Sequence, residues 1–267
     1  MTLRVVIRSN LLYNHPMTKF NNQSTPEERE TFRNKAVETR EAGNLNEALS
    51  MFRQIIDWDE ANDNLRGKID VMGHLRITLT RLAEAEKDED RKKEFRKEAL
   101  KVVEEAMALG EQDATIPEGT KTIQKVHYVN VLHDAGRDEE ALTVVNKALE
   151  NFPGSPAHKA WPANAKAQIQ AELGDVAGAL AMLEQGERWL FEGYAEEFAK
   201  NDQPELKINV WLAGLHLTKA RIYEKEGRHI LAKHYANSVL RISDPTNILG
   251  ERKKEAQKIL DRLGQSK

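Results

Sequence analysis

The chain of 267 residues contains no cysteine. This absence excludes disulfide bridges, thiol nucleophiles and cysteine-ligated metal sites, and it is compatible with a reducing compartment. Glycine, proline and aromatic residues are scarce, whereas alanine, leucine, glutamate, lysine and arginine are abundant. Such a composition favours helices. We therefore expect an all-helical protein without cysteine chemistry.

A long apolar run and a strong net charge are also lacking. No segment reaches the roughly 18–20 apolar residues that a membrane-spanning helix needs. The formal net charge is only -3 at pH 7, so no overall field favours nucleic acid or an anionic membrane surface. The sequence predicts a soluble protein whose partner is neither nucleic acid nor the membrane interior.

Acidic residues are absent from residues 1–26, and the first is Glu27. An arginine-containing segment without acids resembles an organellar transit peptide. The alternatives are a tail, or an extension that precedes a natural start at Met17. Thr25 and Pro26 then predict a helix start, with threonine as N-cap and proline at the first helical position. We expect a cytoplasmic protein, with an organellar location as the alternative.

Four glycines share one sequence setting that predicts a repeat. Each follows an amphipathic run, stands seven residues after a small or β-branched residue, and stands five residues before an alanine. Glycine closes a helix because it accepts a positive φ without a Cβ penalty, and small residues let two antiparallel helices approach closely. The pattern therefore predicts helix hairpins. The glycines are Gly43, Gly136, Gly174 and Gly227; the small residues are Ala36, Val129, Ala167 and Ala220, and the alanines are Ala48, Ala141, Ala179 and Ala232.

Apolar residues and then a proline follow each alanine in the clearest repeats, as at Val145, Ala148 and Pro153. This order of residues resembles the degenerate tetratricopeptide-repeat (TPR) pattern of about 34 residues, most closely from Val126 to Pro156. The resemblance implies a right-handed α-solenoid that binds proteins. One repeat departs from the pattern, because Gly186 stands where an alanine is usual. The residues that follow predict a longer second helix there.

The spacing of the repeats predicts five hairpins. In the second of them a charged turn, residues 87–91, replaces the glycine. After the last hairpin, an amphipathic segment from Ile248 to Leu263 predicts the capping helix that a solenoid needs at its open end. The expected organisation is an extension (1–26), a solenoid (27–246) and a cap (247–267). The five units are expected at 29–62, 68–112, 122–155, 160–198 and 205–245.

Signals for catalysis are absent from the sequence. Two histidine pairs, His127 with His133 and His229 with His234, are six and five residues apart, whereas one helix face needs a spacing of three or four. A glycine-rich phosphate loop and a nucleophile elbow are also missing. The sequence therefore predicts no enzyme, no metal site and no cofactor.

The TPR resemblance implies that the first helix of each hairpin lines a concave groove. Asparagine and glutamine can hold a peptide backbone there, and arginine can bind a carboxylate through two parallel hydrogen bonds. Apolar contacts with a partner are expected from Val126 and Leu217. The register around the small residues places nine candidates in this groove: Arg33, Arg81, Val126, Asn130, Trp161, Asn164, Gln168, Leu217 and Arg221.

Some TPR co-chaperones bind a carboxylate with lysine, asparagine and arginine in three successive repeats. Asn130 and Arg221 fall on such clamp-type positions. Val126 and Leu217 replace the two lysines, however, and Gln168 replaces the middle asparagine. The resemblance to this clamp is therefore partial, and the missing lysines argue against the same ligand.

The sequence thus predicts a scaffold or adaptor that binds a protein or peptide in its groove. Two rival functions stay open, a regulator that senses a small peptide or metabolite and a scaffold that assembles with itself. The groove residues also permit a simpler interpretation, in which they are ordinary solvated helix residues.

Overall fold

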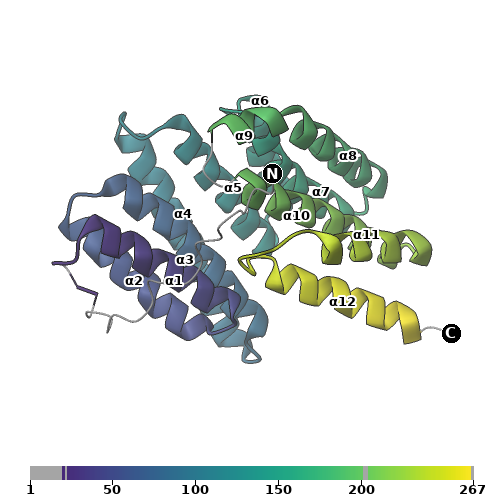
Figure 1. The fold of residues 1–267 in the computed structure, drawn as a ribbon, viewed down its shortest axis with the longest axis horizontal. Coiled ribbons are helices and arrows are strands. Elements are labelled where there is room, and N and C mark those ends of the chain that lie inside the picture. The colour runs from purple at the N-terminus through teal and green to yellow at the C-terminus, as the bar shows by residue number, and fades with distance from the viewer. Residues whose placement is uncertain (1–19, 22, 201–203, 266–267) are drawn as a thin grey trace, which may run out of the picture.

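The computed structural model describes residues 20–21, 23–200 and 204–265 (Figure 1). Over these residues the chain forms α-helices and one short 3₁₀ helix, without a strand, so the all-helical prediction is confirmed. The predicted leader lies almost wholly outside the described residues. The elements are α1 (Pro26–Glu41), α2 (Leu45–Ala61), α3 (Leu65–Ala85), α4 (Glu89–Gln112), α5 (Glu118–Asp134), α6 (Asp138–Glu150), η1 (Pro156–Lys159), α7 (Ala160–Glu172), α8 (Val176–Glu192), α9 (Tyr194–Lys200), α10 (Pro204–Lys225), α11 (His229–Arg241) and α12 (Gly250–Gln265).

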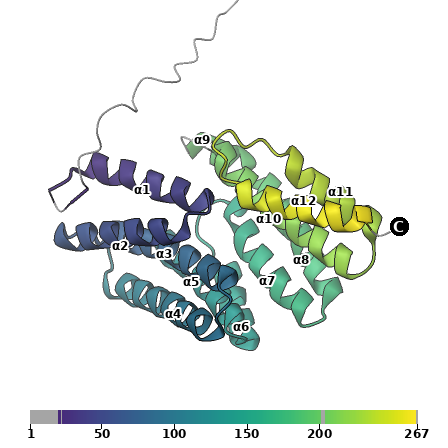
Figure 2. The same cartoon turned by 90° about the horizontal axis from the view of Figure 1, so that it is seen from below.

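The helices pack in chain order as neighbouring pairs. The pairs α1–α2, α3–α4, α5–α6, α7–α8 and α10–α11 correspond to the five hairpins expected from the sequence. Each hairpin also packs against the next one, through contacts such as α2 with α3 and α4 with α5. Figure 2 shows α1 to α4 in one stack and α7 to α12 in another, with α5 and α6 between them.

The hairpins close where the sequence places the four glycines. Gly43 and Gly174 both have φ +90°, and Gly136 and Gly227 have φ +74° and +69°, a region that side chains with a Cβ rarely adopt. All eight small residues of the pattern are fully buried. Close helix contact and a tight turn therefore come from the same local signal.

Replacing Gly174 by alanine is expected to lower the free energy of unfolding by about 1 kcal/mol, through backbone strain. A Cβ at this position meets no atom within 4 Å, so steric overlap contributes nothing. Gly264, an exposed helical glycine with equally open surroundings, is the control, and its alanine variant is expected to be stabilised by up to about 1 kcal/mol. Urea denaturation measures both. Equal shifts in the two variants would contradict the role of positive φ.

Side-chain caps define two further helix starts. Thr25 accepts a hydrogen bond from the backbone of Glu28, whose side chain accepts one from the backbone of Thr25, which confirms the predicted N-cap. In the charged turn of the second hairpin, Asp88 accepts hydrogen bonds from the backbone of Asp90 and Arg91. A carboxylate therefore caps the start of α4, as the carboxylate of Asp175 caps the start of α8.

The fourth hairpin has close contacts that explain its unusual glycines. A Cβ on Gly186 would lie 3.0 Å from a methyl group of Leu215, so glycine lets α8 pack tightly against α10. A Cβ on Gly193 would lie 2.3 Å from the backbone nitrogen of Ala157. The chain turns at Gly193 from α8 into the short helix α9, an element that the repeat pattern did not predict.

The C-terminal helix α12 packs on α10 and α11. Its apolar residues Ala256, Ile259 and Leu263 are buried in a cluster with residues of those two helices. This arrangement agrees with an amphipathic helix that covers the last hairpin. Along the described part of the chain, no helix is both long and apolar enough to span a membrane.

Candidate functional site

A cavity of about 630 Å³ lies between the two ends of the described chain. Its walls come from the first three helices on one side, from α7 and α10, and from α12 on the other side. A second cavity of about 530 Å³, walled by α5, α7 and α10, shares Gln168, Thr218 and Arg221 with the first. We call them the first and second cavity. They adjoin at these three residues, and we call the two cavities together the groove.

Five of the nine predicted groove residues line the first cavity. They come from three helices, α3, α7 and α10, that are far apart in the sequence, and the packing of the hairpins brings them together. Gln168 donates a hydrogen bond to Thr218 across α7 and α10 at 3.1 Å. The five residues are Arg81, Asn164, Gln168, Leu217 and Arg221.

The other four residues line neither cavity. Val126 is fully buried, so the expected apolar contact with a partner is corrected to a core position; α5 has α3, α4, α6 and α7 packed around it. Asn130 donates its side-chain hydrogen bond to the carbonyl of Val126, one turn back in the same helix. Trp161 is half-buried, and its ring meets the edge of His127 with centroids 4.9 Å apart.

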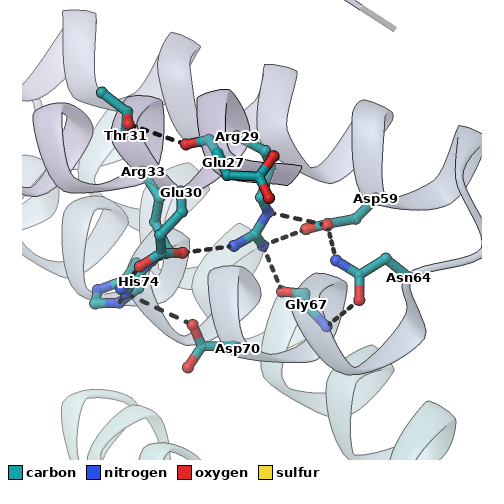
Figure 3. A network of polar contacts seen from close by, with 10 residues as sticks. All are labelled: Glu27, Arg29, Glu30, Thr31, Arg33, Asp59, Asn64, Gly67, Asp70 and His74. Carbon is teal, nitrogen blue, oxygen red and sulfur yellow. Dashed lines mark hydrogen bonds and ion pairs between the residues drawn. The ribbon is translucent and has the colours of Figure 1, made fainter. Parts of the chain in front are cut away.

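Arg33 belongs to a polar network at the other end of the first hairpin (Figure 3). It forms an ion pair with Glu30 on its own helix and lies 3.8 Å from a carboxylate oxygen of Asp70 on α3. One guanidinium nitrogen also lies 3.3 Å from the ring of His74. The contacts of Arg33 therefore connect α1 to α3 and do not reach the cavity.

The two predicted arginines in the cavity already hold carboxylates of this chain. Arg221 on α10 donates two hydrogen bonds of 2.5 Å to Glu255 on α12. Arg81 on α3 donates two of 3.1 Å to Glu41, which also accepts from Arg40. An external carboxylate that bound these arginines would have to compete with these pairs.

Positive charge is in excess around the first cavity. Seven arginine and lysine residues line it, against three glutamates. Arg252 donates to the backbone carbonyl of Val210 at 2.8 Å. Desolvation lowers the pKa of Arg252 to about 10, so this group stays protonated at neutral pH. The cavity thus offers a field that favours anions.

Most of this charge was missed at the level of the sequence, where α12 was expected only to cap the last hairpin. The polar side of the same helix lines the cavity. Its charged residues are spaced three or four positions apart, which places them on one helix face. That spacing was the available signal; it is seen at Glu251, Lys254, Glu255, Lys258 and Arg262.

Asn164 brings an unsatisfied polar atom to the same cavity. Its side-chain oxygen is buried and has no hydrogen-bond partner among the described residues. A hydrogen-bond donor on a ligand could satisfy such a group, and buried polar atoms generally have a partner. The cavity therefore retains hydrogen-bonding capacity at Asn164.

No family model matches this chain, and no curated protein does either. Among the described residues, no group of three or more histidine, aspartate or glutamate side chains is arranged to hold a metal ion. The groove itself, with its polar side chains and its charge, is therefore the feature of this chain that points to a function.

Proposed function

We propose that the chain is a TPR-type scaffold that binds a segment of a partner protein in the groove formed by the two cavities. The observation that carries this proposal is that two cavities lined by α3, α5, α7, α10 and α12 adjoin at Gln168, Thr218 and Arg221. A groove shared by several hairpins suits an extended segment, because each hairpin adds the same kind of side-chain position.

The arrangement of the helix pairs supports the resemblance to TPR proteins. Helix pairs follow each other in chain order, four of them close at a glycine with positive φ, and the small residues are buried between the paired helices. A right-handed solenoid with the first helices on its inner side is the arrangement that this pattern implies for the whole stack. The groove residues of α7 and α10 come from first helices, as that arrangement requires.

Gln168 and Thr218 form the centre of the partner site, because both residues line both cavities. Asn164 lies one turn before Gln168 on α7 and adds the unsatisfied oxygen. Amide side chains can donate to and accept from the backbone of an extended segment. Leu217, although mostly buried, is the apolar member of the predicted set that reaches the cavity.

Replacing Asn164 and Gln168 together by alanine is expected to weaken partner binding about tenfold, because two hydrogen bonds of about 0.5–1.5 kcal/mol each are lost. Proteins that co-purify with the wild-type chain are first identified by mass spectrometry. The strongest of them is then titrated by calorimetry against the wild type and the double variant.

The matched control replaces Asn34 and Gln54, one asparagine and one glutamine that are exposed and lie outside the groove. Thermal melts of both double variants confirm that they are folded. A partner that binds the wild type, the groove variant and the control equally tightly would refute the proposed site.

A further inference from the structure

The part of the first cavity next to α12 has an excess of positive charge, and it lies between the first three helices and the C-terminal helix. Arg252, Lys254 and Lys258 reach it from α12, while Arg40 and Arg81 reach it from α1 and α3. Figure 1 shows α12 alongside the last hairpin, with α1 to α3 to its left, and residues of both sides line the cavity. Cations from opposite ends of the sequence therefore converge on one space.

Ion pairs within the chain cancel only part of this charge, although Lys254 forms one with Glu251 at 2.7 Å. Arg40 and Arg81 share the single carboxylate of Glu41. Arg252 bonds a backbone carbonyl, and for the exposed Lys258 no ion pair is found within the described ranges. Several cations near one another repel unless an anion lies between them.

The volume of the cavity and its other lining residues suit a small polar ligand. The cavity volume of about 630 Å³ lies within the range of small-molecule sites, roughly 300–1,000 Å³. Asn164 adds a buried oxygen without a partner, which a hydroxyl or amide group of a ligand could satisfy. Guanidinium groups bind phosphate and carboxylate oxygens through paired hydrogen bonds.

We infer that this part of the first cavity binds a small polyanion, a molecule with two or more phosphate or carboxylate charges. The polyanion would lie between Arg40 and Arg81 on one side and α12 on the other. It would thereby link the first two hairpins to the C-terminal helix. The site shares its cavity with the proposed partner groove but does not require a protein partner.

The inference is tested with two probes, pyrophosphate and citrate, titrated by calorimetry into the whole chain at low and at high ionic strength. Binding of either probe is expected, and it should weaken as salt screens the charges. Binding of pyrophosphate alone identifies a phosphate ligand, and binding of citrate alone identifies a carboxylate ligand. If neither probe binds at low ionic strength, the inference is wrong.

Replacing Lys254 and Lys258 together by glutamine is expected to weaken binding of the probe about tenfold, because charge-assisted contacts are lost. The control replaces Lys101 and Lys147, which are exposed on α4 and α6 and line neither cavity. The two double variants have the same net charge. Equal weakening in both would indicate non-specific attraction and would overturn the inference.

A second measurement needs no variant. Amine-reactive labelling of the wild-type chain is followed by peptide mass spectrometry, with and without the probe. Protection is expected at Lys254 and Lys258 and not at Lys101 and Lys147. Uniform labelling would contradict the site even if a substitution disturbed the fold. The partner titration with the Asn164 and Gln168 variant is a separate experiment, so each proposal can fail independently.

Discussion

Replacing Asp59 by asparagine is expected to lower the free energy of unfolding by about 3 kcal/mol, because the substitution leaves the buried guanidinium of Arg29 with only the half-exposed carboxylate of Glu30, at 3.3 Å, as its counter-ion. Asp59 is fully buried at the end of α2, and its side chain accepts two hydrogen bonds from Arg29 on α1, of 3.1 and 2.5 Å. Arg29 is itself only 7% exposed. Urea denaturation followed by circular dichroism measures the loss.

The size of this effect follows from the number of helices that the network joins (Figure 3). Arg29 also donates to the carbonyl of Gly67 in α3. Asp59 accepts a further bond of 2.5 Å from Asn64, and the oxygen of that amide caps α3 by accepting from the backbone of Gly67. A single carboxylate thus fixes α1 and the start of α3 relative to α2.

An exposed ion pair with a single hydrogen bond provides the control. Arg53 donates to Glu98 at 2.6 Å, with about half of the arginine side chain exposed. Replacing Glu98 by glutamine is expected to cost less than about 1 kcal/mol, because water screens the pair. If the Asp59 and Glu98 variants lose the same stability, burial does not set the energy of the Asp59 network.

A second substitution separates the lost charge from the lost hydrogen bonds. Replacing Arg29 by methionine in the Asp59→Asn background removes the buried cation, while the new amide oxygen can still accept from Asn64. We expect the double variant to recover at least half of the stability lost by the single variant. A double variant that is less stable than Asp59→Asn would show that packing of the arginine side chain dominates.

Such a network lies beyond what the sequence alone can predict. Hairpins were predictable because their signals are local, as Gly174 and Ala179 are five residues apart and both act within one turn and its two helices. Arg29 and Asp59 are thirty residues apart, and nothing in their immediate surroundings marks them as buried. Gln124, which donates to the carbonyl of Ile69 in α3 from a nearly fully buried position, is a similar case.

The residues of the groove could likewise be predicted only in part from the sequence. The register of single helices predicted Gln168 and Arg221, which do line the cavity, because a position relative to a small packing residue is a local property. Whether a position is exposed to solvent depends on the neighbouring hairpins. Val126 is buried because helices of those hairpins pack around α5. The contribution of Lys258 could not be predicted from one helix, since it depends on the packing of all the hairpins, which brings α12 to the same cavity as the first three helices.

Lowering the pH from about 6.5 to 5.5 is expected to destabilise the protein by up to about 2 kcal/mol, through His74 and His127 together. Burial lowers the pKa of both imidazoles well below the ordinary value, and nearby arginines add to the effect. The unfolded chain therefore binds more protons than the folded chain below pH 6.5, and stability falls as the pH falls. More than about one unit above that pH, both imidazoles are largely neutral in either state, and their contribution changes little.

The geometry around each ring explains why the neutral form is required. Arg76 donates to the Nδ1 atom of His127 at 2.6 Å, and only a neutral imidazole has a lone pair there. His74 lies between Arg33 and Arg40, each with a guanidinium nitrogen 3.3 Å from one of its ring nitrogens. Protonation would place a third positive charge between these two arginines.

The carboxyl group of Asp134 limits the pH range over which the effect of the histidines on the free energy of unfolding can be measured. Desolvation raises the pKa of Asp134, so the folded chain takes up a proton there before the unfolded chain does. That uptake favours the folded state as the pH falls further, and it opposes the effect of the histidines. The comparison is therefore made between pH 7.5 and 5.5, above the range in which ordinary carboxyl groups bind protons.

Replacing His127 by glutamine is expected to halve the dependence of stability on pH, because its amide oxygen can still accept from Arg76 but cannot bind a proton at these pH values. The exposed His229 provides the control, and its glutamine variant is expected to keep the full slope. Urea denaturation at several pH values gives the slopes. A wild-type stability that does not change between pH 7.5 and 5.5 would mean that both rings accept protons in the folded protein, and that the arginines move away from them.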